Sequence, residues 1–356
     1  MDRETVDVYE ARATEWRDKR PVRFPELAKA LGTEVARGAV RVDMGCGSGG
    51  HLQHLGRPVV ALDAAYAMVR LAREAAPGAW PVQADLENLP FRDGSIGGSW
   101  ARASYLHVRQ KRLPWALMQL HRALQVGAPA AFTMRHGNHE GAIDDDEFEG
   151  RLFAEWEPEP LRDVLVGAGF SVDELSYTGG EWINVHAKRA RTLPDFVDAG
   201  MRVLLCGLNP SEYAADAGVG FARPGNRFWP AALAAGLVSR DRDPIHALVA
   251  HRVGMTDLCK RATARAVELS KDEYLAGMQR VERLVRWLRP GAVCFVGLAG
   301  WRVAVDRKAV AGEQPEGLGG VSAYVMPNPS GLNAKTSLDD FAAHLRAAMT
   351  LADRAS

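Results

Sequence analysis

The stretch Val42-Asp-Met-Gly-Cys-Gly-Ser-Gly-Gly50 decides the fold of the first half of the chain. The apolar residues 39–44 predict a buried strand, and the glycines after it let the backbone approach a ligand closely at the start of a helix. Gly45, Gly47 and Gly50 also satisfy a dinucleotide-binding spacing, which alone is a weak signal. The stretch therefore predicts a ligand-binding turn at the carboxyl end of a strand.

Short apolar runs alternate with helical patterns on both sides of this turn. Such alternation is typical of βαβ units and a mostly parallel sheet. The helical pattern is clearest at residues 113–124, where leucines recur on one face. Strands are expected at residues 39–44, 58–63, 80–85, 96–101, 130–135, 171–177 and 181–187.

Acidic residues stand at the ends of the first three expected strands. Asp43 precedes the first glycine, Asp63 ends the second strand and Asp85 ends the third. A carboxylate at the position of Asp63 can accept both ribose hydroxyls of an adenosine, and Asp85 is expected to meet the adenine edge. The acids count against a plain dinucleotide site, and the last of them opens the segment Asp85-Leu-Glu-Asn-Leu-Pro-Phe91.

This set resembles the class I S-adenosylmethionine-dependent methyltransferases of the small-molecule branch (type 11) over residues 5–190. The resemblance implies a Rossmann-like sheet of seven strands and in-line methyl transfer, which depends mainly on proximity and alignment. The methyl acceptor is unknown, and an unliganded scaffold with a decayed site is the alternative. The residues that the resemblance assigns to S-adenosylmethionine are Asp43, Gly45, Gly47, Asp63 and Asp85.

Other polar residues of the first half are expected to be structural. His107 follows the fourth strand, where a lone histidine is more often structural than catalytic. His136 and His139, followed by the acidic residues 144–147, fit no standard metal-ligand spacing and predict a solvated loop, so no metal is expected. The scattered cysteines predict reduced thiols. They are Cys46, Cys206, Cys259 and Cys294.

The start of the chain is not expected to be a signal peptide. The first six residues are polar and acidic, unlike a signal peptide. Apolar runs stay well short of the ~18 residues that span a bilayer. We therefore expect a cytoplasmic protein without a membrane partner.

The βα alternation starts again after the basic stretch 188–194, which predicts a domain boundary. Strands are expected at residues 202–207, 292–297 and 321–326, with a capping box, Ser270 to Glu273, opening a helix that Pro290 stops. Another helix is expected to begin after Ser337. The sequence thus predicts two α/β domains, residues 1–190 and residues 192–356, the second a doubly wound α/β/α unit with a short parallel sheet.

Three segments of the second domain appear in a fixed order. The first places Asn209 at the carboxyl end of a strand, where ligands of α/β proteins bind. The third is a rigid loop with an apolar tip, as unstacking a base requires. The segments are Cys206-Gly-Leu-Asn-Pro-Ser211, Gly218-Val-Gly-Phe-Ala-Arg-Pro-Gly-Asn-Arg-Phe-Trp229 and Met326-Pro-Asn-Pro-Ser-Gly-Leu332-Asn-Ala334.

Together the segments closely resemble the mismatch-specific uracil/thymine DNA glycosylases of the uracil-DNA glycosylase superfamily, over residues 192–350. The resemblance implies that the base flips out of the duplex and that Asn209 positions the attacking water without acting as a strong base. It implies that Phe221 and Leu208 bind the base. The wedge that fills the gap and faces the orphaned base is assigned to Asn328, Ser330, Gly331 and Leu332.

Two departures bear on this resemblance. Ser211 stands where family members commonly have glycine, and Ala334 stands where some have arginine, which puts duplex grip and mismatch preference in doubt. Phe228 and Trp229 are expected to belong to the core, not to the base site.

The main hypothesis is a repair glycosylase, needing no cofactor, fused to a methyltransferase domain. Its substrate would be double-stranded DNA with G·U or G·T mismatches, with uracil excised in preference to thymine or ethenocytosine. One alternative is a methyltransferase whose second half only binds nucleic acid, and another is a binding protein with two decayed sites. The intact Asn209, Phe221 and Leu332 favour the main hypothesis.

The net charge gives a modest further indication. The whole chain of 356 residues has 44 basic and 44 acidic residues, but residues 197–356 contain 20 lysines and arginines against 16 acidic residues. The first 196 residues contain 24 against 28. The neutral total therefore conceals a basic second half, which is compatible with phosphate contacts.

Overall fold

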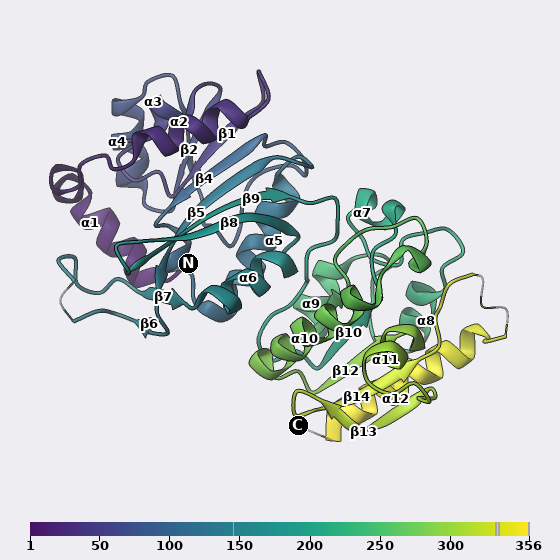
Figure 1. The fold of residues 1–356 in the computed structure, drawn as a ribbon. Coiled ribbons are helices and arrows are strands. Elements are labelled where there is room, and N and C mark those ends of the chain that lie inside the picture. Colours follow the sequence, from purple (N-terminus) through teal and green to yellow (C-terminus); the bar gives the residue numbers. More distant parts are fainter. Residues whose placement is uncertain (145, 332, 334, 355–356) are drawn as a thin grey trace. The chain divides into compact units, whose positions relative to one another are not determined.

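The computed structural model describes residues 1–356 except 145, 332, 334 and 355–356. The chain divides into two compact units, residues 1–190 and residues 191–356 (Figure 1). Each unit has a sheet of its own.

In the first unit, the described residues form a nine-stranded sheet in which β3-β2-β1-β4-β5 run parallel. Beyond β5 the sheet continues with β9, which is antiparallel to β5, and then with β8, which is antiparallel to β9. Together with the five parallel strands these give the seven strands that were expected. The short strands β6 and β7 add to these at the end of β5. The strands are β1 (Arg41–Met44), β2 (Val59–Asp63), β3 (Trp80–Gln83), β4 (Gly98–Arg102), β5 (Pro129–His136), β6 (Glu140–Gly141), β7 (Phe153–Trp156), β8 (Phe170–Thr178) and β9 (Trp182–Arg189).

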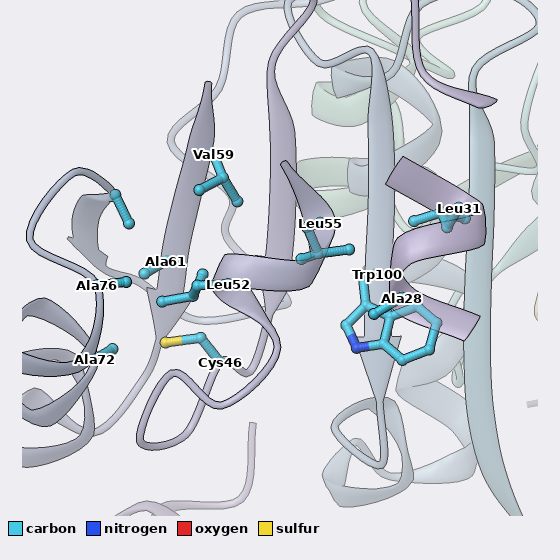
Figure 2. Close-up of a cluster of buried hydrophobic side chains, with 11 residues drawn as sticks. Ala28, Leu31, Cys46, Leu52, Leu55, Val59, Ala61, Ala72, Ala76 and Trp100 are labelled. Carbon is cyan, nitrogen blue, oxygen red and sulfur yellow. The ribbon is translucent and has the colours of Figure 1, made fainter. Parts of the chain in front are cut away.

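The helices of this unit bury apolar faces against the sheet. Figure 2 shows one such cluster, in which Trp100 of β4, Cys46 of the glycine turn and side chains of neighbouring helices pack together. The buried members of this cluster are less than 9% exposed, so the glycine turn packs through Cys46 against a hydrophobic core. The helices are α1 (Arg3–Lys19), α2 (Pro25–Glu34), α3 (Leu52–Leu55), α4 (Tyr66–Ala75), α5 (Leu113–Ala123) and α6 (Pro158–Gly167).

The second unit contains a five-stranded sheet, among its described residues, in the order β11-β10-β12-β14-β13. The first four strands run parallel and β13 is antiparallel to β14. Sequence patterns predicted β10, β12 and β14 but neither edge strand. The strands are β10 (Val203–Gly207), β11 (Val253–Asp257), β12 (Ala292–Val296), β13 (Gly312–Leu318) and β14 (Val321–Met326).

Local signals predicted two of the helices of this unit well. Ser270 caps α10 in a reciprocal pair of hydrogen bonds with Glu273, and Ser337 bonds Asp340 in the same way at the start of α12. The helices are α7 (Glu212–Ala217), α8 (Phe228–Ala234), α9 (Pro244–His251), α10 (Lys271–Leu288), α11 (Leu298–Ala304) and α12 (Leu338–Arg354).

All four cysteine thiols are free and buried. Burial raises the pKa of Cys259 to about 11 and that of Cys294 to about 12, and it raises the pKa of Cys46 and Cys206 well above their ordinary value. Within the part of the chain that the structure describes, no helix combines the length and hydropathy needed to span a bilayer.

Candidate functional site

The glycine turn after β1 is built on left-handed backbone. Gly45 and Gly47 have φ of 75° and 52°, a region that side chains disfavour. Space is restricted as well: a Cβ at Gly45 would clash with Ser104, and one at Gly47 would lie 3.1 Å from the ring of Trp16. Both glycines are therefore required by conformation and by close approach.

Asp43 is the second-last residue of β1, close to this turn, and is 2% exposed. Among the described residues, no donor contacts its Oδ2 atom. Burial, together with the nearby Asp63, raises the pKa of Asp43 to about 8. A buried carboxyl oxygen without a partner is costly unless a ligand satisfies it.

Asp63 ends β2 and connects this strand to the glycine turn. Its Oδ2 accepts from the Gly47 N–H at 2.9 Å and its Oδ1 from the Ala65 N–H at 3.0 Å. Burial raises the pKa of Asp63 to about 6, although these backbone donors act in the opposite direction. Because a carboxylate has about four acceptor positions, each oxygen can still accept a further donor such as a ribose hydroxyl.

Helix α1, which the sequence analysis missed, lies against the same turn. Trp16 approaches Gly47, while Tyr9 and Ala13 pack with residues of α4. The helix has few buried residues and one non-helical residue, Arg12, so its sequence has little amphipathic pattern. Only tertiary packing identifies it as part of the site.

Asp85 follows β3, two residues beyond its last residue. Its carboxylate contacts the amino group of Met1 at 2.7 and 2.8 Å and accepts from the Glu87 N–H. It is 40% exposed, so Asp85 lies at the surface of the first unit, in contrast to the buried Asp43.

His107 is buried in a network behind this site. Its Nδ1 contacts the Leu152 carbonyl at 2.6 Å and its Nε2 contacts the Tyr9 hydroxyl at 2.9 Å. Arg151, ion-paired with Asp146, donates to the same hydroxyl. Burial lowers the pKa of His107 to about 4, so the imidazole is neutral and both ring nitrogens have structural partners.

In the second unit, Asn209 follows β10 by two residues and its amide has a defined orientation. Nδ2 lies 3.1 and 3.0 Å from the carbonyl oxygens of Pro210 and Arg261 and 2.8 Å from Thr263 Oγ1, and these three acceptors share its two N–H groups. Carbonyl oxygens accept only, so the nitrogen must face them. The Oδ1 atom, which no described donor contacts, is available to accept from a water.

Phe221 is held in a left-handed conformation, with φ of 58°. Its ring stacks on Phe228 at 4.2 Å between centroids, and Phe228 packs edge-on against Trp229. The indole of Trp229 donates to the Gly220 carbonyl at 2.8 Å. Phe228 and Trp229 are fully buried, as expected, and they form the support on which Phe221 rests.

Asp257, which the sequence analysis missed, lies beside Phe221. It ends β11 opposite Gly207 of β10 in the parallel register. A Cβ at Gly207 would clash with Oδ1 of Asp257 and would lie 3.5 Å from Cζ of Phe221. The absent side chain of Gly207 therefore leaves room for both groups.

The segment that follows β14 is fixed by Arg227. Its guanidinium donates to the carbonyls of Thr336, Ser330 and Asn333 and lies 4.8 Å from the ring centre of Phe341.

Within the same segment, Asn328 accepts from the Ser330 N–H at 2.9 Å. A Cβ at Gly331 would lie 3.1 Å from the Gly225 carbonyl oxygen. The segments around 225–227 and 328–331 therefore lie side by side. Leu332 and Ala334, singled out as the wedge and as a departure from the family pattern, are outside the described residues.

Two further residues of the first motif have clear structural positions. The Cδ1 methyl of Leu208 lies 3.5 Å from the point where a Cβ of Gly300, in α11, would stand. The Leu208 side chain therefore lies toward α11, whereas the ring of Phe221 lies near Gly207. Ser211 caps α7 by accepting from the Ala214 N–H at 3.1 Å. The hydroxyl thus explains why a serine fits where glycine was the expected residue.

One family model matches within each unit. The model described as "Uracil DNA glycosylase superfamily" matches residues 194–351, and the model described as "Methyltransferase domain" matches residues 42–132.

Similar solved structures include S-adenosylmethionine-dependent methyltransferases. One from Methanosarcina mazei is 16% identical, with 48% of this chain and 99% of that chain covered and a TM-score of 0.40. The 1,6-didemethyltoxoflavin-N1-methyltransferase of Burkholderia thailandensis is 19% identical over 52% and 85%, with a TM-score of 0.41. A possible histamine N-methyltransferase from Thermotoga maritima is 16% identical over 52% and 99%, with a TM-score of 0.41.

Proposed function

The chain joins a methyltransferase domain to a domain of the uracil DNA glycosylase superfamily, and from this premise we propose that it excises uracil opposite guanine from double-stranded DNA. Thymine and ethenocytosine are proposed as weaker substrates. The methyltransferase domain is proposed to span residues 1–190 and the glycosylase domain residues 192–356, in a cytoplasmic protein.

The orientation of Asn209 is the observation that supports this proposal. Its nitrogen is held by two carbonyls and a hydroxyl, so Oδ1 remains to accept from a water directed at C1′ of a flipped nucleotide. Phe221 offers a supported ring face for the base. An amide cannot take up the water's proton as a carboxylate does, so slow catalysis is expected.

The residues after β14 are proposed to contact the DNA. Asn328, Ser330 and Gly331 belong to a segment fixed by Arg227, and with Leu332 they would occupy the gap that the flipped base leaves. The target base must leave the stack before its glycosidic bond can be reached. A protein segment that is already rigid loses little conformational entropy when it fills the gap.

Replacing Asn209 tests the glycosylase assignment. We expect Asn209→Ala to slow single-turnover excision of uracil from a G·U duplex by about 100-fold or more, because the water is no longer positioned. The measurement uses the full chain in excess over duplex, with alkaline cleavage of the abasic product as readout.

Gln279→Ala provides the matched control, since it removes an exposed amide on α10. It should excise at the wild-type rate. No excision by the wild type, or equal excision by wild type and Asn209→Ala, would contradict the assignment. Duplex binding without excision would favour the alternative in which this half only binds nucleic acid.

For the first domain we propose S-adenosylmethionine as methyl donor. The residues fit this cofactor because Asp43 leaves a buried oxygen unpartnered and Asp63 keeps acceptor capacity beside the glycine turn. When bound, the cofactor supplies an electrophilic methyl group on a sulfonium. Asp63 would accept from the ribose hydroxyls, Asp85 would meet the adenine edge, and Gly45 and Gly47 would allow close backbone approach.

Calorimetric titration tests this site. Wild type should bind S-adenosylmethionine, and Asp63→Ala should weaken binding by about 10- to 100-fold, because two charge-assisted hydrogen bonds are lost. Asp93→Ala, which removes a carboxylate that is 65% exposed, should bind as wild type. Absence of binding by the wild type would leave this domain as a scaffold.

A further inference from the structure

Arg102 is a half-buried cation of the first unit that the proposed methyl-donor site does not use. It is the last residue of β4, at the carboxyl end of the parallel strands, where ligands of α/β proteins bind. Its register partner on β5 is Thr133, whose own partner on β9 is Asn184, so the three side chains belong to one face of the sheet. Arg102 Nη1 lies 3.4 Å from Thr133 Oγ1, and this hydroxyl donates to Asn184 Oδ1 at 3.2 Å. A polar row therefore crosses three neighbouring strands.

The guanidinium of Arg102 has no carboxylate partner among the residues that the structure describes, and its one hydrogen bond is the contact with Thr133. Arg41, the buried arginine that begins β1, is satisfied differently, since its guanidinium donates to backbone carbonyls. Burial lowers the pKa of Arg102, and the charge of Arg23 acts in the same direction. A guanidinium nevertheless stays charged at neutral pH. Because a desolvated cation without an acceptor is costly, Arg102 has the capacity to bind an anion.

Trp100, two residues earlier on the same face of β4, is a second donor without a partner. The residue is 4% exposed, and its Nε1 contacts no acceptor within the described part of the chain. Its ring belongs to the cluster of Figure 2, with side chains of α2, and lies 5.4 Å from the ring of His51. Burial lowers the pKa of His51, so this imidazole is neutral at pH 7 and brings no charge to the region.

The segment that leads into α2 connects Arg102 to the glycine turn. Val22 Cγ2 lies 2.6 Å from the point where a Cβ of Gly50 would stand. The ring centre of Phe24 lies 4.6 Å from the guanidinium carbon of Arg102. Arg23, between these two residues in the chain, is exposed. Both arginines therefore lie beside the turn that is proposed to hold the methyl donor, where a methyl acceptor must also bind.

Exposed apolar side chains accompany the two arginines. Val22 and Phe24 are each 43% exposed, and Leu27, in the first turn of α2, is 50% exposed. Phe24 has a φ of 59°, a left-handed conformation that residues other than glycine seldom adopt. Large apolar side chains grouped at a surface indicate a binding site. Cationic and apolar groups at one place suit an organic anion with an apolar body.

We propose that Arg102 and Arg23 bind the anionic group of the methyl acceptor, a small organic carboxylate or phosphate whose apolar part packs on Phe24. This inference rests on the proposed methyltransferase function and names the chemical class of its substrate. The planar guanidinium of Arg102 can contact two oxygens of either anion at once, which anchors the acceptor in one orientation.

Calorimetric titration of the full chain with octanoate, octyl phosphate and octylamine, in the presence of S-adenosylmethionine, tests the proposal. The wild type should bind the two anions about tenfold or more tightly than the amine. Arg102→Gln should weaken anion binding by about tenfold or more, and Arg23→Gln by about twofold to fivefold, because Arg23 is exposed. The relative affinities of octanoate and octyl phosphate show whether a carboxylate or a phosphate is preferred.

Arg37→Gln is the matched control, since it removes an exposed arginine from the turn between α2 and β1, and it should bind both anions as the wild type does. All three variants should bind S-adenosylmethionine with the wild-type affinity, which also shows that they are folded. Phe24→Ala should weaken binding of octanoate but not of acetate, which has no apolar body.

Equal anion binding by the wild type and Arg102→Gln, equal binding of octanoate and octylamine, or no binding of these compounds would overturn the inference. If S-adenosylmethionine still binds, the proposed methyltransferase function stands. Displacement of octanoate by a mismatch-free DNA duplex would assign the anion to a nucleic acid and overturn the small-molecule acceptor. Anion binding by a wild type that does not bind S-adenosylmethionine would overturn both the acceptor role and the proposed methyltransferase function.

Discussion

At the scale of single residues, the orientation of Asn209 depends on the groups that its nitrogen contacts. Two of them are carbonyls and the third is the hydroxyl of Thr263, which is 3% exposed. The Thr263 N–H in turn donates to the Pro210 carbonyl at 3.2 Å. The loop after β11 is thus bonded to the motif after β10 from both sides.

Thr263→Val removes the hydroxyl with little change in shape. We expect the excision rate to fall by about fivefold to tenfold, which corresponds to the net value of one hydrogen bond of about 1 kcal/mol. Duplex affinity should not change, since the Thr263 side chain is buried and its hydroxyl bonds Asn209. Thr263→Ser should restore the rate, and a loss of affinity without loss of rate would contradict this role.

The residues that the sequence analysis missed share one property. Asp257 and Thr263 lie about fifty positions from the motif that they complete, and the parallel pairing of β10 with β11 brings them to it. Asn209 and Asp63 could be singled out as candidates because Asp63 ends a buried strand and Asn209 follows one by two residues, and α/β ligands bind at such positions. No local pattern identifies which distant residue will face them.

At the scale of elements, local chemistry was predictable and long-range support was not. The capping boxes at Ser270 and Ser337 involve only neighbouring residues, so their patterns identify two helix starts. Strand β13 contains two glutamates, a proline and two glycines, so its seven residues lack an apolar alternation. It becomes a strand because β14 offers a free edge.

Arg227 directly precedes α8 and bonds to the segment that follows β14, so it connects two parts of the domain that are far apart in the sequence. We expect Arg227→Ala to leave three carbonyls without their donor, to lower the free energy of unfolding by about 1–3 kcal/mol and to weaken binding of a G·U duplex. Faster amide hydrogen exchange in residues 328–336 is the direct measurement.

Arg307→Ala, which removes an exposed arginine of the same domain, provides the control for net charge and should leave both exchange and affinity unchanged. Unaltered exchange in Arg227→Ala would show that the segment is held by other contacts.

At the scale of the whole molecule, the two units have their candidate sites at the same place in the sheet but use different side chains there. Both place polar side chains at the carboxyl ends of parallel strands: the acids belong to the last two residues of β1 and β2, and the amide follows β10. This rule is what selected both candidate sites from the sequence. The excess of 20 basic over 16 acidic residues in 197–356 is modest beside it, so specific side chains and not net charge carry the functional assignment.

The four buried thiols have a practical consequence for studying this molecule. Because thiolate is the reactive form and burial keeps these groups protonated, the thiols of the native chain should not react with maleimide or iodoacetamide reagents. A single cysteine introduced on an exposed surface would then be the one labelled position. Fluorescent or spin probes could be attached to either domain without first replacing the native cysteines.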